Sequence, residues 1–420
     1  MRHLIVNASQ LLTLAGPDRA RRGKEMGSLG LVRGGAVLID GGKILAAGLR
    51  DLVQAHELAS TARLVDAGGR VVLPGFVDSH AHPVFAGPRL RDFAARLQGK
   101  GYAEIAAEGG GILSTVNGVR GATQDELSRG LRARAGRFLE CGTTTLEAKS
   151  GYGLDLDSEL KMLRAVKAVA EAGPLELVGT LLGAHALPGE WKHDREGYIA
   201  RVCEEMIPAA AREGLARFVD VFCERGFFTV EDSERVFAAG AKAGLKAKIH
   251  AEQLTRSASL PMAVRCGAVS ADHLDCADDS DLELLAKSGI VASLVPGSNY
   301  FLAKPYPPAR RLIDAGAAVA LATDFNPGSC PCWDMRTILS IACTQMRLTP
   351  EEALVAATMN GACALGLGRT HGSLEPGKVA DLVCYEAEDY REIPYYFGAP
   401  QVAWTMKRGA LVHSRQEYRL

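Results

Sequence analysis

The sequence lacks the features that mark several classes of protein. Among its 420 residues there is no run of about 18 apolar residues, so no transmembrane helix is expected. Residues 1–7 contain no long apolar core of the kind that a secretory signal needs. The formal net charge is only −1 and basic residues are spread along the chain, so we expect neither nucleic acid nor a membrane as a partner.

Closely spaced cysteine pairs are also missing. The ten cysteines include no Cys-x-x-Cys pair, and Cys330 and Cys332 come closest to one. Scattered thiols without a secretory signal are typical of reduced cysteines in a cytoplasmic protein. Cys330 lies near Asp324, which leaves a functional thiol as an alternative, but a packed and inert thiol is the favoured interpretation.

Histidine is scarce, with ten residues, yet several of them stand in informative positions. The apolar, β-branched run 71–79 predicts a buried strand, and His80 and His82 follow it directly. Side chains at i and i+2 on a strand point to one face, so these two imidazoles would project together. A His-x-His pair alone is weak evidence for a metal site. Three further polar residues end short apolar runs in the same way: His250, His273 and Asp324.

The middle of the chain alternates candidate strands with helical patterns. Eight candidate strands end near Ser79, Glu147, His185, Glu224, His250, His273, Pro296 and Asp324. A capping box at residues 123–126 opens a helical run that reaches Leu139, and Thr229 opens another that closes near Gly240 and Gly244. This alternation predicts an α/β fold, a (β/α)8 TIM-like barrel with functional groups at the carboxyl ends of its strands. Strands one and eight of a barrel are neighbours, so strand-end residues far apart in sequence can share one metal.

The two ends of the chain have a different pattern. Residues 36–45 predict a hairpin with a Gly-rich turn, and residues 380–385 and 401–409 predict further strands. Neither end has enough strands for a stable core of its own. We therefore expect a small composite β-sandwich domain from residues 1–70 and 371–420, beside a barrel formed by residues 71–370.

Imidazoles combined with a carboxylate favour one divalent metal ion, Zn²⁺ or Fe²⁺, and these ligand types do not choose between the two. Histidines together with Asp324 leave room for a water, which is typical of a catalytic site. Such an ion lowers the pKa of its water towards ~7, and Asp324 can accept the proton. Lys149 ends strand two and could bridge two metals after carbamylation, but strand four ends in Cys223 and Glu224, so one metal is favoured.

Two further residues are candidates for moving protons. Glu252 shares a strand face with His250 and could carry a proton to a leaving nitrogen; a solvated carboxylate at a strand end is the alternative. His273 is either a fourth metal ligand or a group that orients a ligand or polarises the substrate. Its spacing in the sequence does not decide between these interpretations.

Five segments carry a family resemblance. Residues 73–82 (LPGFVDSHAH) and 372–383 (GSLEPGKVADLV) resemble the amidohydrolase superfamily. Residues 147–154 (EAKSGYGL), 250–253 (HAEQ) and 323–329 (TDFNPGS) are similar to one family within it, the imidazolonepropionases. That resemblance implies a hydrolase that opens the cyclic amide of 4-imidazolone-5-propanoate to N-formimidoyl-L-glutamate in histidine degradation. Another amidohydrolase, such as an aromatic or formimino-group deaminase, is the alternative, and a catalytically inactive barrel that serves binding or assembly comes third.

The resemblance also implies a role for individual residues. Four match the family's metal ligands: His80, His82, His250 and Asp324. Seven match its contacts with substrate and product: Arg89, Tyr152, His185, Gln253, Asn326, Gly328 and Ser329. Glu252 and His273 match its catalytic positions that move protons. A guanidinium at Arg89 suits a propanoate tail, because it binds a carboxylate through two parallel hydrogen bonds that lysine cannot make. A small-molecule substrate and a homodimer are further expectations from the resemblance.

Overall fold

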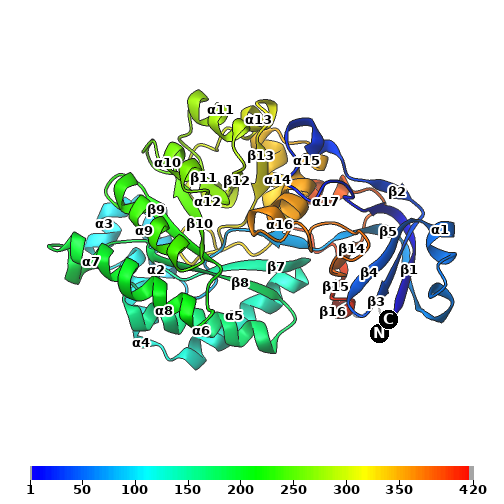
Figure 1. Ribbon diagram of the computed structural model, residues 1–420, viewed down its shortest axis with the longest axis horizontal. Coiled ribbons are helices and arrows are strands. Elements are labelled where there is room, and N and C mark those ends of the chain that lie inside the picture. Colours follow the sequence, from blue (N-terminus) through cyan, green and yellow to red (C-terminus); the bar gives the residue numbers. More distant parts are fainter. Residues whose placement is uncertain (1, 416–420) are drawn as a thin grey trace.

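The computed structural model describes residues 2–415, which form two sheets surrounded by helices (Figure 1). One sheet has eight parallel strands, each beside its neighbour in sequence, from β6 to β13. Their bounds are β6 Phe76–Asp78, β7 Thr143–Lys149, β8 Glu176–Ala184, β9 Phe218–Cys223, β10 Lys246–Ala251, β11 Ser270–His273, β12 Val291–Leu294 and β13 Ala318–Leu321. The predicted (β/α)8 barrel is therefore confirmed, and each strand ends within three residues of its predicted end.

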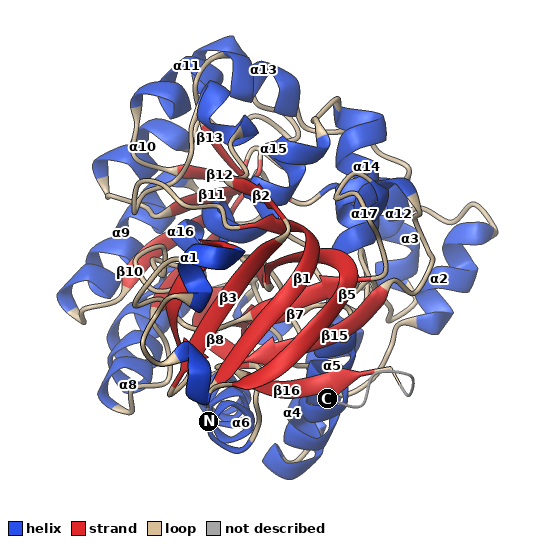
Figure 2. Ribbon diagram, turned by 90° about the vertical axis from the view of Figure 1, so that its right-hand side faces the viewer, coloured by secondary structure: helices blue, strands red, loops and turns tan. Residues whose placement is uncertain are grey.

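Helices follow the barrel strands and cover their outer faces (Figures 1 and 2). The longer ones are α2 Leu90–Leu97, α4 Ile112–Gly121, α5 Gln124–Glu140, α6 Leu156–Ala172, α9 Val230–Lys242, α11 Asp279–Lys287 and α14 Met335–Met346. The shorter ones are α3 Tyr102–Ala107, α7 Arg195–Arg201, α8 Ile207–Arg212, α10 Leu260–Arg265, α12 Pro296–Leu302, α13 Ala309–Asp314, α15 Pro350–Val355, α16 Gly361–Ala364 and α17 Glu392–Tyr395. Helix α1 Arg50–Gln54 precedes the first barrel strand and belongs to the N-terminal segment. Within residues 2–415, no helix combines the length and the apolar character that crossing a membrane requires.

The predicted helix starts are confirmed at atomic detail. The Thr123 hydroxyl accepts a hydrogen bond from the backbone N–H of Glu126, whose carboxylate accepts one from the backbone N–H of Thr123. Thr229 and Asp232 form the same reciprocal pair at the start of α9. These bonds satisfy backbone donors that have no partner inside a helix, and they fix where each helix leaves its loop.

The barrel closes through backbone hydrogen bonds beyond the ends of β6 and β13. The Asp324 N–H donates to the His80 carbonyl at 2.9 Å, and the His82 N–H donates to the Phe325 carbonyl at 2.8 Å. Two residues before His80, the buried Asp78 carboxylate accepts hydrogen bonds from the Thr323 N–H at 3.0 Å and the Thr323 hydroxyl at 2.6 Å. This seam fixes the first and last strands in register at the end of the barrel where the candidate ligands lie.

The second sheet joins the two ends of the chain. Its strands lie in the order β16-β15-β14-β5-β1-β3-β4, and β2 pairs with β1. Their bounds are β1 His3–Leu12, β2 Leu31–Arg33, β3 Gly35–Asp40, β4 Lys43–Leu49, β5 Arg63–Pro74, β14 Leu382–Tyr385, β15 Val402–Lys407 and β16 Ala410–Ser414. One buried cluster, which includes Ile5, Val72, Cys384 and Trp404, draws only on strands and loops. Within residues 2–415, no member of that cluster belongs to a helix, as expected of a small β-sandwich.

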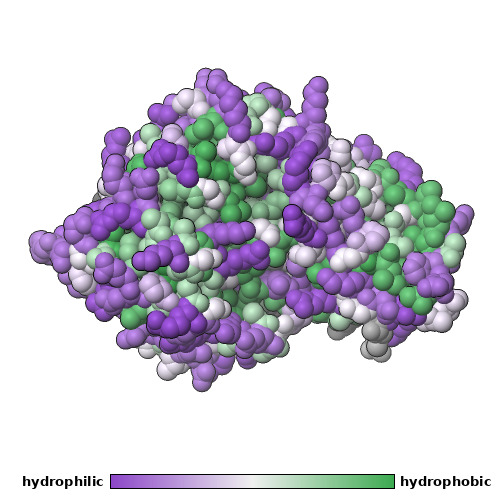
Figure 3. All heavy atoms as spheres, in the orientation of Figure 1, coloured by the Kyte–Doolittle hydropathy of each residue, from purple (hydrophilic) through white to green (hydrophobic). Residues whose placement is uncertain are grey.

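The N-terminal hairpin follows its sequence signal. Strands β3 and β4 pair antiparallel, and the turn between them has positive φ at both Gly41 (56°) and Gly42 (79°), as a two-residue hairpin turn requires. Figure 3 shows hydrophobic side chains on the surface at this end of the molecule, where Leu49 and Leu52 are exposed. The division of the chain at residues 70 and 371 stays a prediction.

Candidate metal centre and active site

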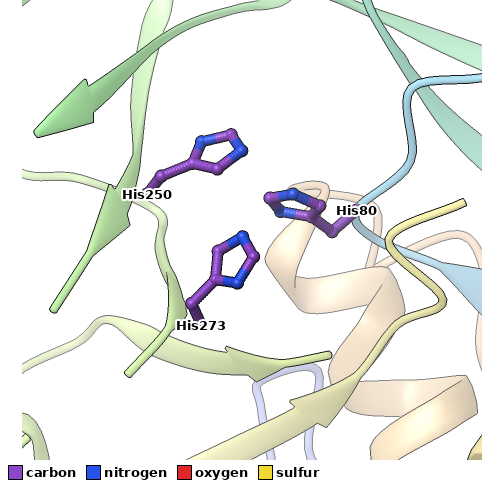
Figure 4. A group of neighbouring side chains, drawn as sticks. All are labelled: His80, His250 and His273. Atoms are coloured by element: carbon purple, nitrogen blue, oxygen red, sulfur yellow. The ribbon is translucent and has the colours of Figure 1, made fainter. Parts of the chain in front are cut away.

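Four histidines converge at the carboxyl ends of the barrel strands. His80 and His82 follow β6, His250 lies in β10 and His273 ends β11. The His80 ring centroid lies 5.3 Å from that of His82, 4.5 Å from that of His250 and 5.2 Å from that of His273. Figure 4 shows the rings of His80, His250 and His273 pointing toward one another from separate elements. The barrel thus brings together the strand-end histidines that the sequence singled out.

Asp324 completes this cluster from the far side of the barrel seam. Its Oδ1 lies 3.7 Å from His80 Nε2 and 3.5 Å from His82 Nε2. One ligand atom each from His80, His82 and Asp324 lies within 4.8 Å of the others, and the same holds for His80, His250 and His273. Imidazole nitrogens and a carboxylate at such spacing suit a divalent transition ion.

The hydrogen bonds of the histidines leave lone pairs for such an ion. His80 Nδ1 lies 2.6 Å from Asp272 Oδ2 and donates to it, while the buried His80 Nε2 has no hydrogen-bond partner in the described chain. His250 Nδ1 lies 3.0 Å from Asp220 Oδ2, which directs its Nε2 in the same way. A carboxylate on one ring nitrogen and a free second nitrogen is the usual arrangement of a metal-binding histidine. The residues present therefore fit a divalent metal ion.

Burial sets the protonation of these groups. It lowers the pKa of His80, His82 and His273 well below the ordinary value, so their rings are neutral and can offer a lone pair. It also raises the pKa of Asp324 well above the ordinary value. A cation beside the Asp324 carboxylate would favour its ionised form, since a bound ion is often the largest local charge in a site.

Three strand ends in the site have left-handed backbone. The φ angles are 52° at Glu252, 79° at His273 and 52° at Asp324. Non-glycine residues seldom adopt this conformation, and such residues cluster at functional sites, where the surrounding structure holds them in place. Here the left-handed backbone occurs one residue after β10, at the last residue of β11 and three residues after β13, at the mouth of the barrel.

Arg89 lies against Gly328 at the mouth of the barrel. It precedes helix α2, and a methyl group placed on Gly328 would come within 1.9 Å of Arg89 Nη2. A second arginine, Arg96, donates a hydrogen bond to the Gly328 carbonyl at 2.8 Å and lies over the ring of Phe301 at 4.9 Å. The sequence reasoning missed Arg96, although its place seven residues beyond Arg89, on the same face of the helix, was a usable signal.

Asn326 shapes the loop between Asp324 and Gly328. Its Oδ1 accepts hydrogen bonds from the N–H groups of Gly328 at 2.8 Å and Ser329 at 2.7 Å. Its Nδ2 donates to the Asp324 carbonyl and to the Ser329 hydroxyl, both at 2.7 Å. The Asn326 amide therefore holds the loop of Gly328 and Ser329 in shape beside Asp324.

Tyr152 and His185 form an aromatic wall beside His82. The His185 ring stacks on that of His82 with centroids 5.3 Å apart, and Tyr152 lies 5.4 Å from His185. His185 Nδ1 lies 2.8 Å from the Gly151 carbonyl and donates to it, which leaves Nε2 as an acceptor. Burial lowers the pKa of His185 to about 3, so this ring is neutral as well.

Glu252 lies in the site segment, but its carboxylate faces a loop. It accepts hydrogen bonds from the Ser257 N–H at 2.6 Å, the Ser259 N–H at 2.9 Å and the Ser259 hydroxyl at 2.9 Å. The side chain is fully buried, which excludes the solvated alternative. A role in proton transfer would require it to leave these bonds.

The next residue, Gln253, is half-buried, and its carbonyl accepts a hydrogen bond from the Cys276 thiol.

The structure shows the surroundings of two reactive groups near the site, Cys330 and Lys149. Cys330 is buried, and burial raises the pKa of its thiol well above the ordinary value, as expected of an inert thiol. Lys149 Nζ lies 2.6 Å from Asp220 Oδ2 and 3.0 Å from Glu147 Oε2. This lysine is held among carboxylates.

The sequence reasoning missed the charged residues below the histidines. Asp220 and Lys248 lie inside apolar strands, and a charged residue at an inward position of such a strand is the signal that could have identified them. Burial alone would raise the pKa of Asp220, but His250 and Lys149 outweigh it and hold that pKa well below the ordinary range. Burial raises the pKa of Asp272, with Lys248 and Lys149 acting in the opposite direction.

Known proteins resemble this chain in sequence over almost its whole length. A family model described as the amidohydrolase family matches residues 71–412. The chain is 46% identical over 417 residues to an imidazolonepropionase of Geobacillus kaustophilus, covering 98% of each. It is 44% identical over 409 residues to an imidazolonepropionase of Shouchella clausii, covering 96% of this chain and 91% of that one.

Solved structures share the fold at much lower sequence identity. A zinc-bound adenosine deaminase from Xanthomonas campestris has a TM-score of 0.72 at 20% identity and covers 97% of this chain and 92% of its own. A triazine hydrolase variant has a TM-score of 0.74 at 17% identity, covering 98% and 95%. These likenesses concern the fold, whereas the sequence relatives define the group. The chain belongs to the amidohydrolase family and, within it, to the imidazolonepropionases.

Proposed function

We propose that the chain hydrolyses the cyclic amide C–N bond of 4-imidazolone-5-propanoate to give N-formimidoyl-L-glutamate. The observation that carries this proposal is the contact between Arg89 and Gly328, on the loop that follows Asp324. A substrate whose ring lies at the histidine cluster can extend its carboxylate to this guanidinium. The relatives named imidazolonepropionase support the same assignment, and with it a place in histidine degradation.

One divalent ion, Zn²⁺ or Fe²⁺, would be held by His80, His82, His250 and Asp324. When bound, the ion supplies Lewis-acid activation of water and of the substrate carbonyl. His80 shares one group of close ligand atoms with His82 and Asp324 and another with His250, which supports a single ion beside His80. Lys149 and Lys248 fill the space behind them with ammonium groups.

The remaining residues bind the substrate and move protons. Arg89 binds the propanoate carboxylate, and His185 Nε2 can accept a hydrogen bond from a ring N–H. Asp324 takes the proton of the attacking water, and the neutral His273, whose buried Nδ1 has no hydrogen-bond partner in the described chain, stabilises the developing charge. The leaving ring nitrogen must gain a proton before the bond breaks, and Glu252 remains the proposed donor once it has left the Ser257–Ser259 loop.

The remaining proposed substrate contacts lie around the histidine cluster. Tyr152 packs beside the His82 ring. Gly328, Ser329 and Gln253 lie on loops at the same end of the barrel. Asn326 acts by holding the loop of Gly328 and Ser329.

Incubation of the metal-loaded protein with freshly generated 4-imidazolone-5-propanoate tests the proposal. We expect the ultraviolet absorbance of the substrate to disappear and mass spectrometry to detect N-formimidoyl-L-glutamate without release of ammonia. Ammonia as the first product would assign a deaminase instead. A folded, metal-loaded protein that leaves the substrate unchanged would assign a catalytically inactive barrel.

We further propose a cytoplasmic protein that forms a homodimer. All ten cysteines are free, which suits a reducing compartment. The homodimer derives from the family resemblance, and the exposed aromatic residues Tyr395 and Phe397 offer a surface for it. Analytical ultracentrifugation of the purified protein tests the dimer, and a monomer at micromolar concentration would contradict it.

A further inference from the structure

Five charged side chains fill the barrel directly behind His80 and His250. They are Glu147, Lys149, Asp220, Lys248 and Asp272, and all five are 0% exposed. The interior of such barrels is usually packed with branched apolar residues, so a buried layer of two cations and three carboxylates departs from the normal pattern. Burying unpaired charges is costly, and side chains in this position persist only when each is paired and hydrogen-bonded.

Lys149 connects the carboxylates that orient two separate candidate ligands. Its Nζ lies 2.6 Å from Asp220 Oδ2 and 3.7 Å from Asp272 Oδ2. Asp220 in turn accepts from His250, and Asp272 accepts from His80. The Lys149 ammonium group therefore contacts both carboxylates: Asp220, which orients His250, and Asp272, which orients His80.

Lys248 has a different set of contacts, although it is equally buried. Its Nζ lies 2.8 Å from Glu147 Oε2, 2.6 Å from the Ser79 carbonyl and 3.8 Å from Asp272 Oδ2. Within the described chain no ion pair joins Lys248 to Asp220. Substitution of either lysine thus removes one positive charge. Only Lys149, however, contacts Asp220, the carboxylate that orients His250.

A second group of possible ligand atoms lies behind His80, where the two lysines already supply positive charge. His80, Glu147 and Asp272 each place one such atom within 4.8 Å of the others, close enough to hold a cation. Lys149 and Lys248 lie 3.0 Å and 2.8 Å from Glu147 and supply positive charge there. Their ammonium groups leave Asp272 directed at His80 Nδ1, which keeps Nε2 available on the other side of the ring.

We propose that Lys149 is a positioning residue of the metal centre, which holds Asp220 and Asp272 together so that His250 and His80 present Nε2 to one shared ion. The inference rests on the proposed metal site but not on the identity of the substrate. An imidazole that is free to rotate must lose that freedom on binding a metal, and loss of such supporting contacts typically weakens metal binding about 10–100-fold.

Zinc affinity of matched lysine variants tests the inference. Lys149→Met and Lys248→Met each remove one fully buried ammonium ion, so both should lower the unfolding temperature of the metal-free protein. Zn²⁺ affinity is then measured by competition with a chromogenic chelator, on protein shown to be folded by circular dichroism. We expect Lys149→Met to weaken Zn²⁺ binding about 10–100-fold and Lys248→Met less than about threefold.

A second variant keeps the test decisive if Lys149→Met does not fold. Asp220→Asn is nearly isosteric and leaves Lys149 in place, but weakens the link to His250, so it should also weaken Zn²⁺ binding by about tenfold. Wild-type affinity in Asp220→Asn or in Lys149→Met would overturn the inference, and so would equal losses in the two lysine variants. Because the readout needs no substrate, its failure is distinguishable from failure of the hydrolysis assay.

Discussion

The Arg89 guanidinium lies so close to Gly328 that a methyl group on that glycine would fall 1.9 Å from Arg89 Nη2. No side chain can occupy position 328 without moving the arginine. The contact couples a loop after β13 to the residue that precedes α2.

Gly328→Ala should therefore displace Arg89 without straining the backbone, since Gly328 is not among the glycines with positive φ. We expect kcat/KM for the propanoate substrate to fall roughly ten- to a hundred-fold, mainly through KM, because a charge-assisted contact is lost. Steady-state kinetics provide the measurement. Gly87→Ala is the matched control, since a methyl group there meets nothing within 4 Å. Equal kinetics for both variants would contradict the proposed role.

Arg89→Lys keeps the charge but removes the planar, two-pronged donor. We expect KM to rise and kcat/KM to fall roughly ten- to several-hundred-fold, with little change in unfolding temperature. Kinetics and thermal unfolding on the same preparation separate the two effects. An unchanged kcat/KM would leave Arg89 without a role in binding the propanoate.

His80→Ala should lose most of the bound metal and the activity, because His80 belongs to both ligand groups of the site. Metal content measured by plasma mass spectrometry checks this expectation directly. The exposed His193 offers a control, since His193→Ala removes an imidazole far from any predicted ligand role. Full metal occupancy in His80→Ala would mean that the ligand assignment is wrong.

Glu252→Gln tests the proposed proton donor against the loop contacts seen in the structure. We expect the variant to keep its metal and lose about 10²–10⁴ in kcat, the usual range for a general acid–base group. Metal content, kcat and unfolding temperature are measured together. A lower unfolding temperature with near-normal kcat would limit Glu252 to holding Ser257 and Ser259, and would assign proton transfer to His273 or Asp324.

Glu176 should make the stability of the protein depend on pH. Its contacts with His371, and then with Lys407 and Arg408, hold the pKa of this carboxyl well below the ordinary value near 4.3, although burial opposes them. A depressed folded-state pKa gives stability that is present above the unfolded-state value and is lost as pH falls through the folded-state value.

The matching measurement is the free energy of unfolding in urea for the wild type and Glu176→Gln at pH 7 and at pH 3.5. The variant should be about 1–3 kcal/mol less stable at pH 7, and the difference should shrink at the lower pH. An equal difference at both values would show that ionisation of Glu176 does not contribute.

The sequence predicted the barrel and the clustering of the candidate ligands, because each candidate ligand follows a short apolar run. That pattern identifies a strand, its carboxyl end and the residue placed there, as at His80 and His250. It did not predict the direction of the Glu252 carboxylate, because the left-handed backbone at that residue rotates the side chain away from the simple alternation of a strand. It also gave no pairing for Lys149 with Asp220, since alternation shows which residues face inward but not which of them meet across a barrel.

The closing seam of the barrel has a consequence for the order of folding. His80 and Asp324 are brought together by backbone hydrogen bonds between the first and the last segments of the barrel. A partly folded chain that has formed strands β6 to β12 holds the four clustered histidines but lacks Asp324 opposite them. With the proposed ligand set, tight metal binding would therefore require a closed barrel, and the ion would stabilise completed molecules but not partly folded ones.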